Sequence, residues 1–225
     1  MDLFNVNRFF NIHKGERLIL VCNGPSLMNE DFNLIEGELK FAMNKIYLGF
    51  KDLNFYPNYY IAINKLVIEQ SISQINNLNC ISFISENSRD KIVKKPMRYF
   101  IPSLKIFDFS YDITKGINEG FTVTYAALQI AYYMGFKQVL IIGMDHKYTF
   151  KGEPNDLSFC RGLDKNHFNS SYFQNSNWNN PDLKKSEYFY SIAREVYEKD
   201  GREIIDCTKG GSCTIFRKSK LNNYL

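Results

Sequence analysis

Short apolar runs alternate with longer amphipathic stretches along the chain. The apolar runs are rich in aliphatic and β-branched residues, which is typical of strands covered on both faces. They occupy 17–22, 40–43, 59–63, 80–84, 138–143 and 203–206. Helix-like stretches lie between them, at 65–76, 122–134 and 186–199. Strands that alternate with helices predict an α/β fold with a mainly parallel sheet flanked by helices.

One polar stretch, 145–182, does not fit this alternation. It is rich in Asn, Gly and Pro, and it holds Trp178 together with His146 and His167. It is too long and too polar for a plain connector, and long loops of this kind are usually lids or binding loops. Its many aromatic residues argue against permanent disorder. We interpret 145–182 as a lid over the carboxyl-end edge of the sheet, within a single domain that spans 1–225.

Composition narrows the class of protein. The chain has 225 residues and a net charge of +4, and its basic residues are dispersed, so no nucleic-acid footprint is present. Its five cysteines are odd in number and lack CxxC spacing, which argues against a zinc site. No signal-peptide pattern and no run of 18 apolar residues occur, so we expect a cytoplasmic protein.

Three asparagines follow three successive predicted strands. They are Asn23, Asn44 and Asn64. Because parallel strands end at one edge of a sheet, the three carboxamides are expected to line one crevice, where open α/β sheets bind ligands. A carboxamide can donate and accept hydrogen bonds without adding charge. Each asparagine alone could equally be an ordinary strand-end residue, which Asn favours.

Two glycine-containing turns lead from strands or loops into helices. The first predicted strand stops at a turn that contains Gly24 and Ser26. A second turn, at 119–121, feeds a helix whose first turn carries Thr122 and Thr124. The N–H groups at the start of a helix and nearby hydroxyls suit a phosphate. Both turns are also compatible with simple helix caps that bind nothing.

Four further residues could carry chemistry. The strand at 138–143 ends at Gly143, and Asp145 could order the following loop, hold a ribose or bind a metal. His167 lies in polar surroundings within the lid and is the candidate general base, with His146 as its rival. Tyr148 could donate a hydrogen bond to a departing phosphate.

Together these residues resemble a known group of enzymes. The resemblance rests on the 23–27 element, Asn44, Asn64, the Thr-x-Thr helix start, Gly143-x-Asp145 and the 167–168 pair. The chain looks like bacterial sialyltransferases of the lipooligosaccharide-modifying type. It looks equally like the domain shared by motility-associated (Maf) glycosyltransferases and archaeal 6-hydroxymethylpterin diphosphokinases. The resemblance runs from Arg17 to Phe216 and implies a Rossmann-like sheet with a lid that binds a CMP-activated acidic sugar.

The resemblance also implies roles for single residues. His167 would be the base that deprotonates the acceptor hydroxyl, and Tyr148 would contact the CMP phosphate. The donor would be bound by Asn23, Gly24, Ser26, Asn44, Asn64, Thr122, Thr124, Gly143 and Asp145. The reaction would invert the anomeric centre, with no metal and no cofactor beyond the CMP-sugar donor. The chain departs from those sialyltransferases at Glu119-Gly120-Phe121, where they carry an arginine just before the hydroxyl segment.

Three hypotheses follow. The leading one is a CMP-sugar-dependent glycosyltransferase of bacterial polysaccharide biosynthesis. It would move a nonulosonate-like or Kdo-like sugar to a glycan or lipid-linked glycan. The alternative is a pterin diphosphokinase-like pyrophosphoryl transfer enzyme that uses ATP and Mg²⁺, with Asp145, Asp156 and Asp164 as its carboxylates. The third is a sensor that binds the nucleotide without catalysis. Attachment to the inner face of the cell membrane and assembly into a homo-oligomer stay open.

Overall fold

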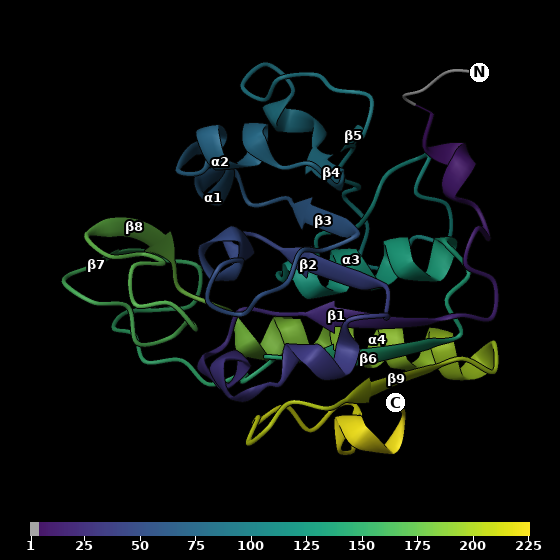
Figure 1. Cartoon of the computed structure of the whole chain (residues 1–225). Coiled ribbons are helices and arrows are strands. Elements are labelled where there is room, and N and C mark those ends of the chain that lie inside the picture. Colours follow the sequence, from purple (N-terminus) through teal and green to yellow (C-terminus); the bar gives the residue numbers. More distant parts are fainter. Residues whose placement is uncertain (1–4) are drawn as a thin grey trace.

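An eight-stranded parallel sheet forms the centre of the molecule in the computed structural model, which describes residues 5–225 (Figure 1). Its strands lie in the order β10-β9-β6-β1-β2-β3-β4-β5. Their bounds are β1 Arg17–Val21, β2 Lys40–Met43, β3 Tyr59–Ala62, β4 Ile81–Ser85, β5 Arg98–Ile101, β6 Gln138–Ile142, β9 Glu203–Asp206 and β10 Arg217–Lys218. The order runs one way from β1 to β5 and the other way from β1 to β10. The order in which strands are added therefore reverses between β1 and β6, and open α/β sheets bind ligands at such a switch point.

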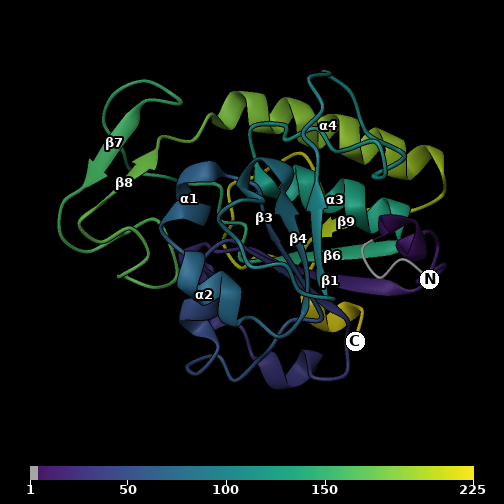
Figure 2. The ribbon, with the colours of Figure 1, turned by 90° about the horizontal axis from the view of Figure 1, so that it is seen from above.

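Helices cover both faces of the sheet (Figure 2). On one face lie α3 (Val123–Tyr133) and α4 (Leu183–Lys199), and on the other lie α1 (Lys65–Glu69) and α2 (Ile72–Asn77). Alternate residues of each strand point to opposite faces, so Leu18 and Leu20 pack with α3 and α4, while Ile19 and Val21 pack on the other side. The prediction of an α/β fold with a mainly parallel, Rossmann-like sheet flanked by helices is confirmed.

Single turns of 3-10 helix supplement the longer helices. They are η1 Val6–Phe9, η2 Pro25–Asn29, η3 Phe32–Ile35, η4 Ile46–Gly49, η5 Glu86–Ser88 and η6 Leu221–Asn223. Two of them, η2 and η4, follow β1 and β2 directly and thus stand where a longer helix would begin in a simple βαβ unit. Short turns therefore follow β1 and β2 in place of long helices. Other segments of the chain cover this edge of the sheet.

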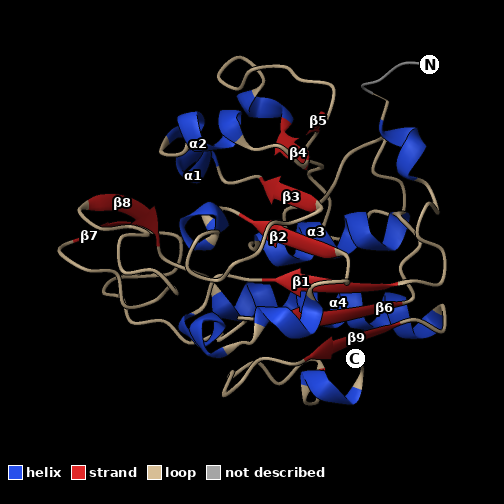
Figure 3. Cartoon of the chain, in the orientation of Figure 1, coloured by secondary structure: helices blue, strands red, loops and turns tan. Residues whose placement is uncertain are grey.

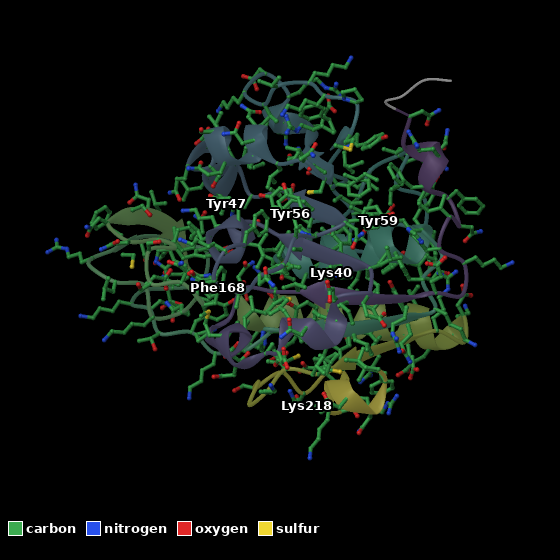
Figure 4. All side chains as sticks on the ribbon, viewed as in Figure 1. Lys40, Tyr47, Tyr56, Tyr59, Phe168 and Lys218 are labelled. Atoms are coloured by element: carbon green, nitrogen blue, oxygen red, sulfur yellow. The ribbon has the colours of Figure 1, made fainter. Side chains whose placement is uncertain are left out.

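The stretch 145–182, which we call the lid segment, lies beyond the carboxyl ends of the central strands (Figure 3). It contains a two-stranded antiparallel hairpin, β7 (Leu157–Cys160) with β8 (Ser176–Asn179), and is otherwise loop. Phe168, Tyr172 and Trp178 are buried against the sheet face that α1 and α2 cover. Figure 4 places Phe168 at this edge of the sheet and Tyr59 toward the opposite edge. The lid segment is thus packed onto the sheet.

One helix predicted from the sequence is broken in the structure. The stretch 65–76 forms α1 and α2, with a turn at Gln70 and Ser71 between them. Ser71 is fully buried and its hydroxyl accepts a 2.7 Å hydrogen bond from Tyr47 Oη. The Gln70 amide donates to Asn177 O of the lid segment at 2.7 Å. Contacts with distant segments therefore replace the continuous helix that local spacing favours.

Other boundaries differ by smaller amounts. The helix predicted at 186–199 is α4, which begins at Leu183 because Asp182 caps it by accepting from Lys185 N at 3.1 Å. Strands β5 and β10 were not predicted. Arg98 starts β5 although it is charged, because its guanidinium donates to the carbonyl of Ile75 at 2.7 Å and to that of Val93. These backbone carbonyls accept from both terminal nitrogens of the guanidinium, which lets Arg98 be buried in the sheet although its Nε has no partner.

Candidate functional site

Two adjoining cavities lie where the sheet changes direction. The inner cavity, of about 90 Å³, is lined by residues at the ends of β1, β2 and β6. The outer cavity, of about 790 Å³, extends from there toward the lid segment and the start of α4. Both are lined by Asn44, Thr122, His146, Tyr148 and His167, so the two spaces are continuous. A volume of this size is in the range of small-molecule binding sites.

The end of β1 is held against the end of β6. Gly24 N donates to Gly143 O at 2.7 Å, and a side chain at Gly24 would collide with the Asp145 carboxylate. Only glycine fits here, for reasons of space. The preceding Asn23 is buried, and its amide donates to Met43 O at 3.2 Å. Its Oδ1 has no hydrogen-bond partner and its side chain lines the inner cavity.

Asn44, at the end of β2, repeats this feature. Its φ is 52°, a left-handed conformation that asparagine tolerates better than most residues. Its backbone is fixed at both ends, since its N–H donates to Ile61 O at 2.9 Å and Tyr60 Oη donates to its carbonyl at 2.7 Å. Its Oδ1 is buried without a partner. A buried oxygen without a partner costs about 1–3 kcal/mol, and both asparagines that carry one line the inner cavity.

The third strand-end asparagine lies apart from the other two. Asn64 is exposed, lines the outer cavity, and caps α1 by accepting from Val67 N at 3.1 Å. The structure therefore brings Asn23 and Asn44 together in the inner cavity and sets Asn64 at the wall of the outer one. Its role as a helix cap is enough to explain an asparagine at position 64.

Asp145 and Ser26 bind to each other. Ser26 Oγ donates to Asp145 Oδ2 at 2.6 Å, and Ser26 N lies 3.2 Å from the same carboxylate. Asp145 lines the inner cavity, whereas Ser26 lines neither cavity. The pair fixes the turn after β1 to the loop after β6, where Gly143 has a φ of 70°. Of the three possible roles of Asp145, this contact supports the ordering of the loop.

The start of α3 faces both cavities through its hydroxyls. Thr122 caps the helix, since its Oγ1 accepts from Thr124 N at 3.3 Å, and it also lies 3.0 Å from Tyr190 Oη. Thr124 lines the inner cavity, where its hydroxyl donates to Met43 Sδ at 3.7 Å. The N-terminus of this 11-residue helix supplies N–H groups and partial positive charge at the cavity wall.

His167 is part of an imidazole–carboxylate pair. Its Nδ1 lies 2.9 Å from Asp164 Oδ2, and its ring stacks on Tyr172 with centroids 3.9 Å apart. Burial raises the pKa of Asp164, but hydrogen bonds from His167 and from the N–H groups of Asn166 and Phe173 outweigh it and hold this pKa below its ordinary value. Because an ionised carboxylate only accepts, Nδ1 donates and Nε2 is left to take a proton.

His146 forms a second pair of this kind. Its Nε2 lies 3.0 Å from Glu187 Oε1 on α4, and its side chain lines both cavities. Tyr148, also in the lid segment, lines both cavities as well, and burial holds its pKa above its ordinary value. A tyrosine that stays protonated can donate a hydrogen bond to an anion. The geometry thus keeps both histidines and Tyr148 as candidates.

Sequence reasoning missed Tyr190 and Lys45. Tyr190 lines both cavities from the buried side of α4, a position that the helical pattern alone assigns to the core. Lys45 directly follows Asn44, and its ammonium donates to Tyr172 O at 2.7 Å and to Gln70 Oε1 at 2.8 Å. Its place next to a strand end was the signal that could have identified it. Both residues hold groups that line the cavities in position.

Residues 5–225 contain neither a candidate metal site nor a candidate membrane-spanning helix. No group of three or more His, Cys, Asp and Glu side chains within residues 5–225 is arranged to hold a metal ion. Of the helices in the same range, none combines the length and the apolar character that a membrane crossing requires.

Comparison with known proteins agrees with this architecture. The chain is similar in structure to a Maf glycosyltransferase from Magnetospirillum magneticum AMB-1, with a TM-score of 0.57 and 14% sequence identity. That alignment covers 99% of this chain and 38% of the Maf protein, so the chain spans well under half of that protein's length. At this identity the likeness shows the fold. No curated protein matches the sequence. Residues 2–151 match the family model described as 6-hydroxymethylpterin diphosphokinase MptE-like, and the chain belongs to that family.

Proposed function

We propose that this protein is a glycosyltransferase that moves an acidic, nonulosonate-like or Kdo-like sugar from a CMP donor to a hydroxyl of a surface glycan. The observation that carries the proposal is the pair of unpartnered amide oxygens, Asn23 Oδ1 and Asn44 Oδ1, on two residues that line a cavity which also reaches His167. The fold shared with a Maf glycosyltransferase is consistent with this reaction class.

The polar groups suit the parts of a CMP ester. The two amide oxygens accept hydrogen bonds, which ribose hydroxyls and the cytosine amino group can donate. The start of α3, with Thr122 and Thr124, suits the phosphate. The inner cavity is too small for a whole nucleotide, so the donor would extend into the outer cavity.

The chemistry needs one proton acceptor and a leaving group. The acceptor oxygen forms a bond to the anomeric carbon while the bond from that carbon to the CMP phosphate oxygen breaks, which inverts the centre. The hydroxyl proton passes to His167 Nε2, and CMP leaves with the bonding electrons. Asp164 holds the imidazole in the required tautomer, and Tyr148 donates to the departing phosphate.

A second candidate, pyrophosphoryl transfer from ATP, is favoured by the description of the family model. It would need carboxylates free to hold Mg²⁺. The carboxylates that line the cavities are engaged, since Asp145 binds Ser26, Glu119 binds Ser103 and Asp182 binds Asn155. These contacts support glycosyl transfer as the first choice.

His167→Ala tests the proposal. We expect turnover of a CMP-sugar, found by screening activated acidic sugars, to fall by about 10²–10⁴-fold, because general-base catalysis contributes that much. The affinity for CMP, measured by calorimetry, should stay within about twofold, since a kinetic role does not require ground-state binding. His13→Ala is the matched control, because His13 lines neither cavity and contacts Tyr59.

Three results would contradict the proposal. Tighter binding of ATP with Mg²⁺ than of CMP would favour the pyrophosphoryl transfer enzyme. CMP binding without turnover of any activated acidic sugar would favour a sensor. Undiminished turnover in His167→Ala would remove His167 from the mechanism and leave His146 as the base.

A further inference from the structure

The outer cavity changes character with distance from the inner one. Near the sheet it is lined by amides, hydroxyls and histidines. Toward the loop that joins β5 to α3, the polar residues Ser103, Lys105, Asn118 and Glu119 share the lining with six large apolar side chains. These are Leu104, Ile106, Phe107, Phe121, Leu183 and Phe189. Figure 2 shows this loop running alongside α4, which supplies Leu183 and Phe189. The end of the cavity at this loop, which we call the apolar end, thus adds large apolar side chains that the inner end lacks, and such a site suits a reaction between two different molecules.

Three phenylalanines form a row at the apolar end, which we call the aromatic shelf (Phe107, Phe121 and Phe189). The rings of Phe107 and Phe189 have centroids 6.1 Å apart and an interplanar angle of 23°. Those of Phe121 and Phe189 are also 6.1 Å apart, at 28°. Phe189 is buried, but Phe107 is 75% exposed and Phe121 is 42% exposed. Two exposed rings, each inclined by at most 28° to the ring of Phe189, therefore line the cavity.

The backbone at Phe121 is held in an unfavourable conformation. Its φ is 59°, in the left-handed region that a bulky side chain rarely adopts. Thr122 caps α3 immediately after it, and Lys185 Nζ lies 4.5 Å from the centre of its ring. Phe121 therefore lowers stability in two ways, through the exposure of an apolar ring to water and through the strain of its backbone. Such strain concentrates at ligand-binding sites, where the ring's position is what matters.

An acceptor oxygen without a partner lies on the same cavity. Asn180 is 1% exposed, and its amide donates to Lys151 O at 2.8 Å and to Glu153 O at 3.0 Å. Its Oδ1 is buried and has no hydrogen-bond partner. With both donor bonds made to the backbone, the orientation of this side chain is fixed. Asn180 lines the outer cavity, so a hydroxyl group of a bound molecule is one donor that would satisfy this oxygen.

We infer that the aromatic shelf and Asn180 form the subsite for a saccharide acceptor. A pyranose ring has an apolar face of C–H groups, which suits the electron-rich face of a phenyl ring, and a rim of hydroxyls, which suits an amide oxygen. An acyl chain would use the rings but leave Asn180 Oδ1 unpaired. The inference rests on the proposed function, because the same cavity reaches His167, which would deprotonate the acceptor hydroxyl.

Substitutions at the exposed rings test this subsite. Phe107→Ala removes a side chain that is mostly exposed, and Phe121→Asn removes a ring while placing at φ 59° a residue that tolerates it. Both variants should therefore fold. Phe121→Tyr keeps the ring. Phe10→Ala is the matched control, because Phe10 is 61% exposed and lines neither cavity.

The probe is an array of bacterial surface oligosaccharides, followed by calorimetry with the saccharide that binds most tightly. We expect the wild-type chain, Phe121→Tyr and Phe10→Ala to bind alike. We expect Phe107→Ala and Phe121→Asn to bind at least about tenfold more weakly, because each loses the burial of a ring. Calorimetry with CMP should give the same affinity for all five proteins, since each keeps the proposed nucleotide contacts Asn23, Asn44, Thr122 and Thr124.

The outcomes separate this inference from the proposed function. The absence of any saccharide binding, or equal binding by both ring-deleted variants and the wild type, overturns the inference even where CMP binds. Binding to phosphatidylglycerol vesicles that depends on the same rings, without saccharide binding, overturns it in favour of a lipid. Saccharide binding that depends on the rings, in a chain that does not bind CMP, supports the inference and rejects the donor proposed above.

Discussion

Lys45, which follows β2, is one of the residues that hold the lid segment against the sheet. It is 6% exposed, and its ammonium donates to Tyr172 O at 2.7 Å while lying 4.5 Å from the centre of the Phe173 ring. Burial lowers the pKa of Lys45 to about 8, although the charge of Asp164 opposes this change. The contact between the end of β2 and the residues that stack on His167 therefore depends on a lysine that is easily deprotonated.

The pH dependence of stability follows from this pKa. Between about pH 8 and pH 10.5 the unfolded chain keeps a proton on Lys45 that the folded chain has released. The unfolded state binds more protons in this window, so Lys45 makes the free energy of unfolding rise with pH. We expect the difference between the wild type and Lys45→Gln in urea unfolding to grow across the window. Tyrosines and cysteines titrate in both proteins, and their contributions cancel in the difference.

Lys91→Gln provides the control. The hydrogen bond of Lys91 to Glu69 raises the pKa of Lys91 above 10.5, so any stability that this lysine contributes is lost as the pH rises through that value. The difference for Lys45→Gln should therefore rise between about pH 8 and pH 10.5, whereas that for Lys91→Gln should stay flat there and fall only above pH 10.5. A flat difference for Lys45→Gln would contradict the burial of its ammonium.

Thr122 joins two elements, since it caps α3 and contacts Tyr190 of α4. Removing an N-cap hydroxyl typically costs about 1 kcal/mol. We expect Thr122→Ala to lower the free energy of unfolding by about that amount in urea, and Thr122→Ser to restore most of it. Unchanged stability in Thr122→Ala would show that the helix start is held by its surroundings, and the phosphate site proposed there would lose one of its fixed groups.

Local sequence pattern predicts the elements whose bounds do not depend on contacts with distant segments. Strands β2 and β9 were predicted with their observed bounds, because short segments with a buried apolar centre have few alternatives. The break between α1 and α2 was not predictable, since it depends on Tyr47 and on the lid segment. Strand β5 was missed because Arg98 finds its carbonyl partners only after folding.

The site was predictable to the extent that topology creates it. Asn23 and Asn44 meet because β1 and β2 are parallel neighbours, which alternation along the chain already suggests. The assignment of His167 as the base stays a prediction, and so does the action of 145–182 as a lid. Tyr190 could not be recognised, because its spacing on α4 is the spacing of a core residue. The helical pattern does not distinguish a side chain that packs from one that also lines a cavity.

At the scale of the whole molecule, the sheet and the lid segment enclose the cavities jointly. Phe168 N donates to Asn23 O at 2.9 Å, so the lid segment is bonded to the end of β1 beside the inner cavity. Phe173 and Trp178 pack with the sheet face that α1 and α2 cover. A ligand in the inner cavity therefore contacts both parts, and its binding should stabilise the lid segment together with the central strands.

This coupling predicts how the whole chain responds to CMP. A ligand at about 100 times its dissociation constant adds about 2.7 kcal/mol to the free energy of unfolding, which a thermal shift detects. We expect slower hydrogen exchange in the lid segment as well as at the ends of β1 and β2. Asn44→Gly is the decisive variant, because glycine accepts the φ of 52° and only the amide is lost. Stabilisation by CMP should fall strongly in Asn44→Gly and persist in His167→Ala, whose imidazole is assigned to the acceptor proton. Equal stabilisation of Asn44→Gly and the wild type would mean that the unpartnered amide oxygen does not meet the nucleotide.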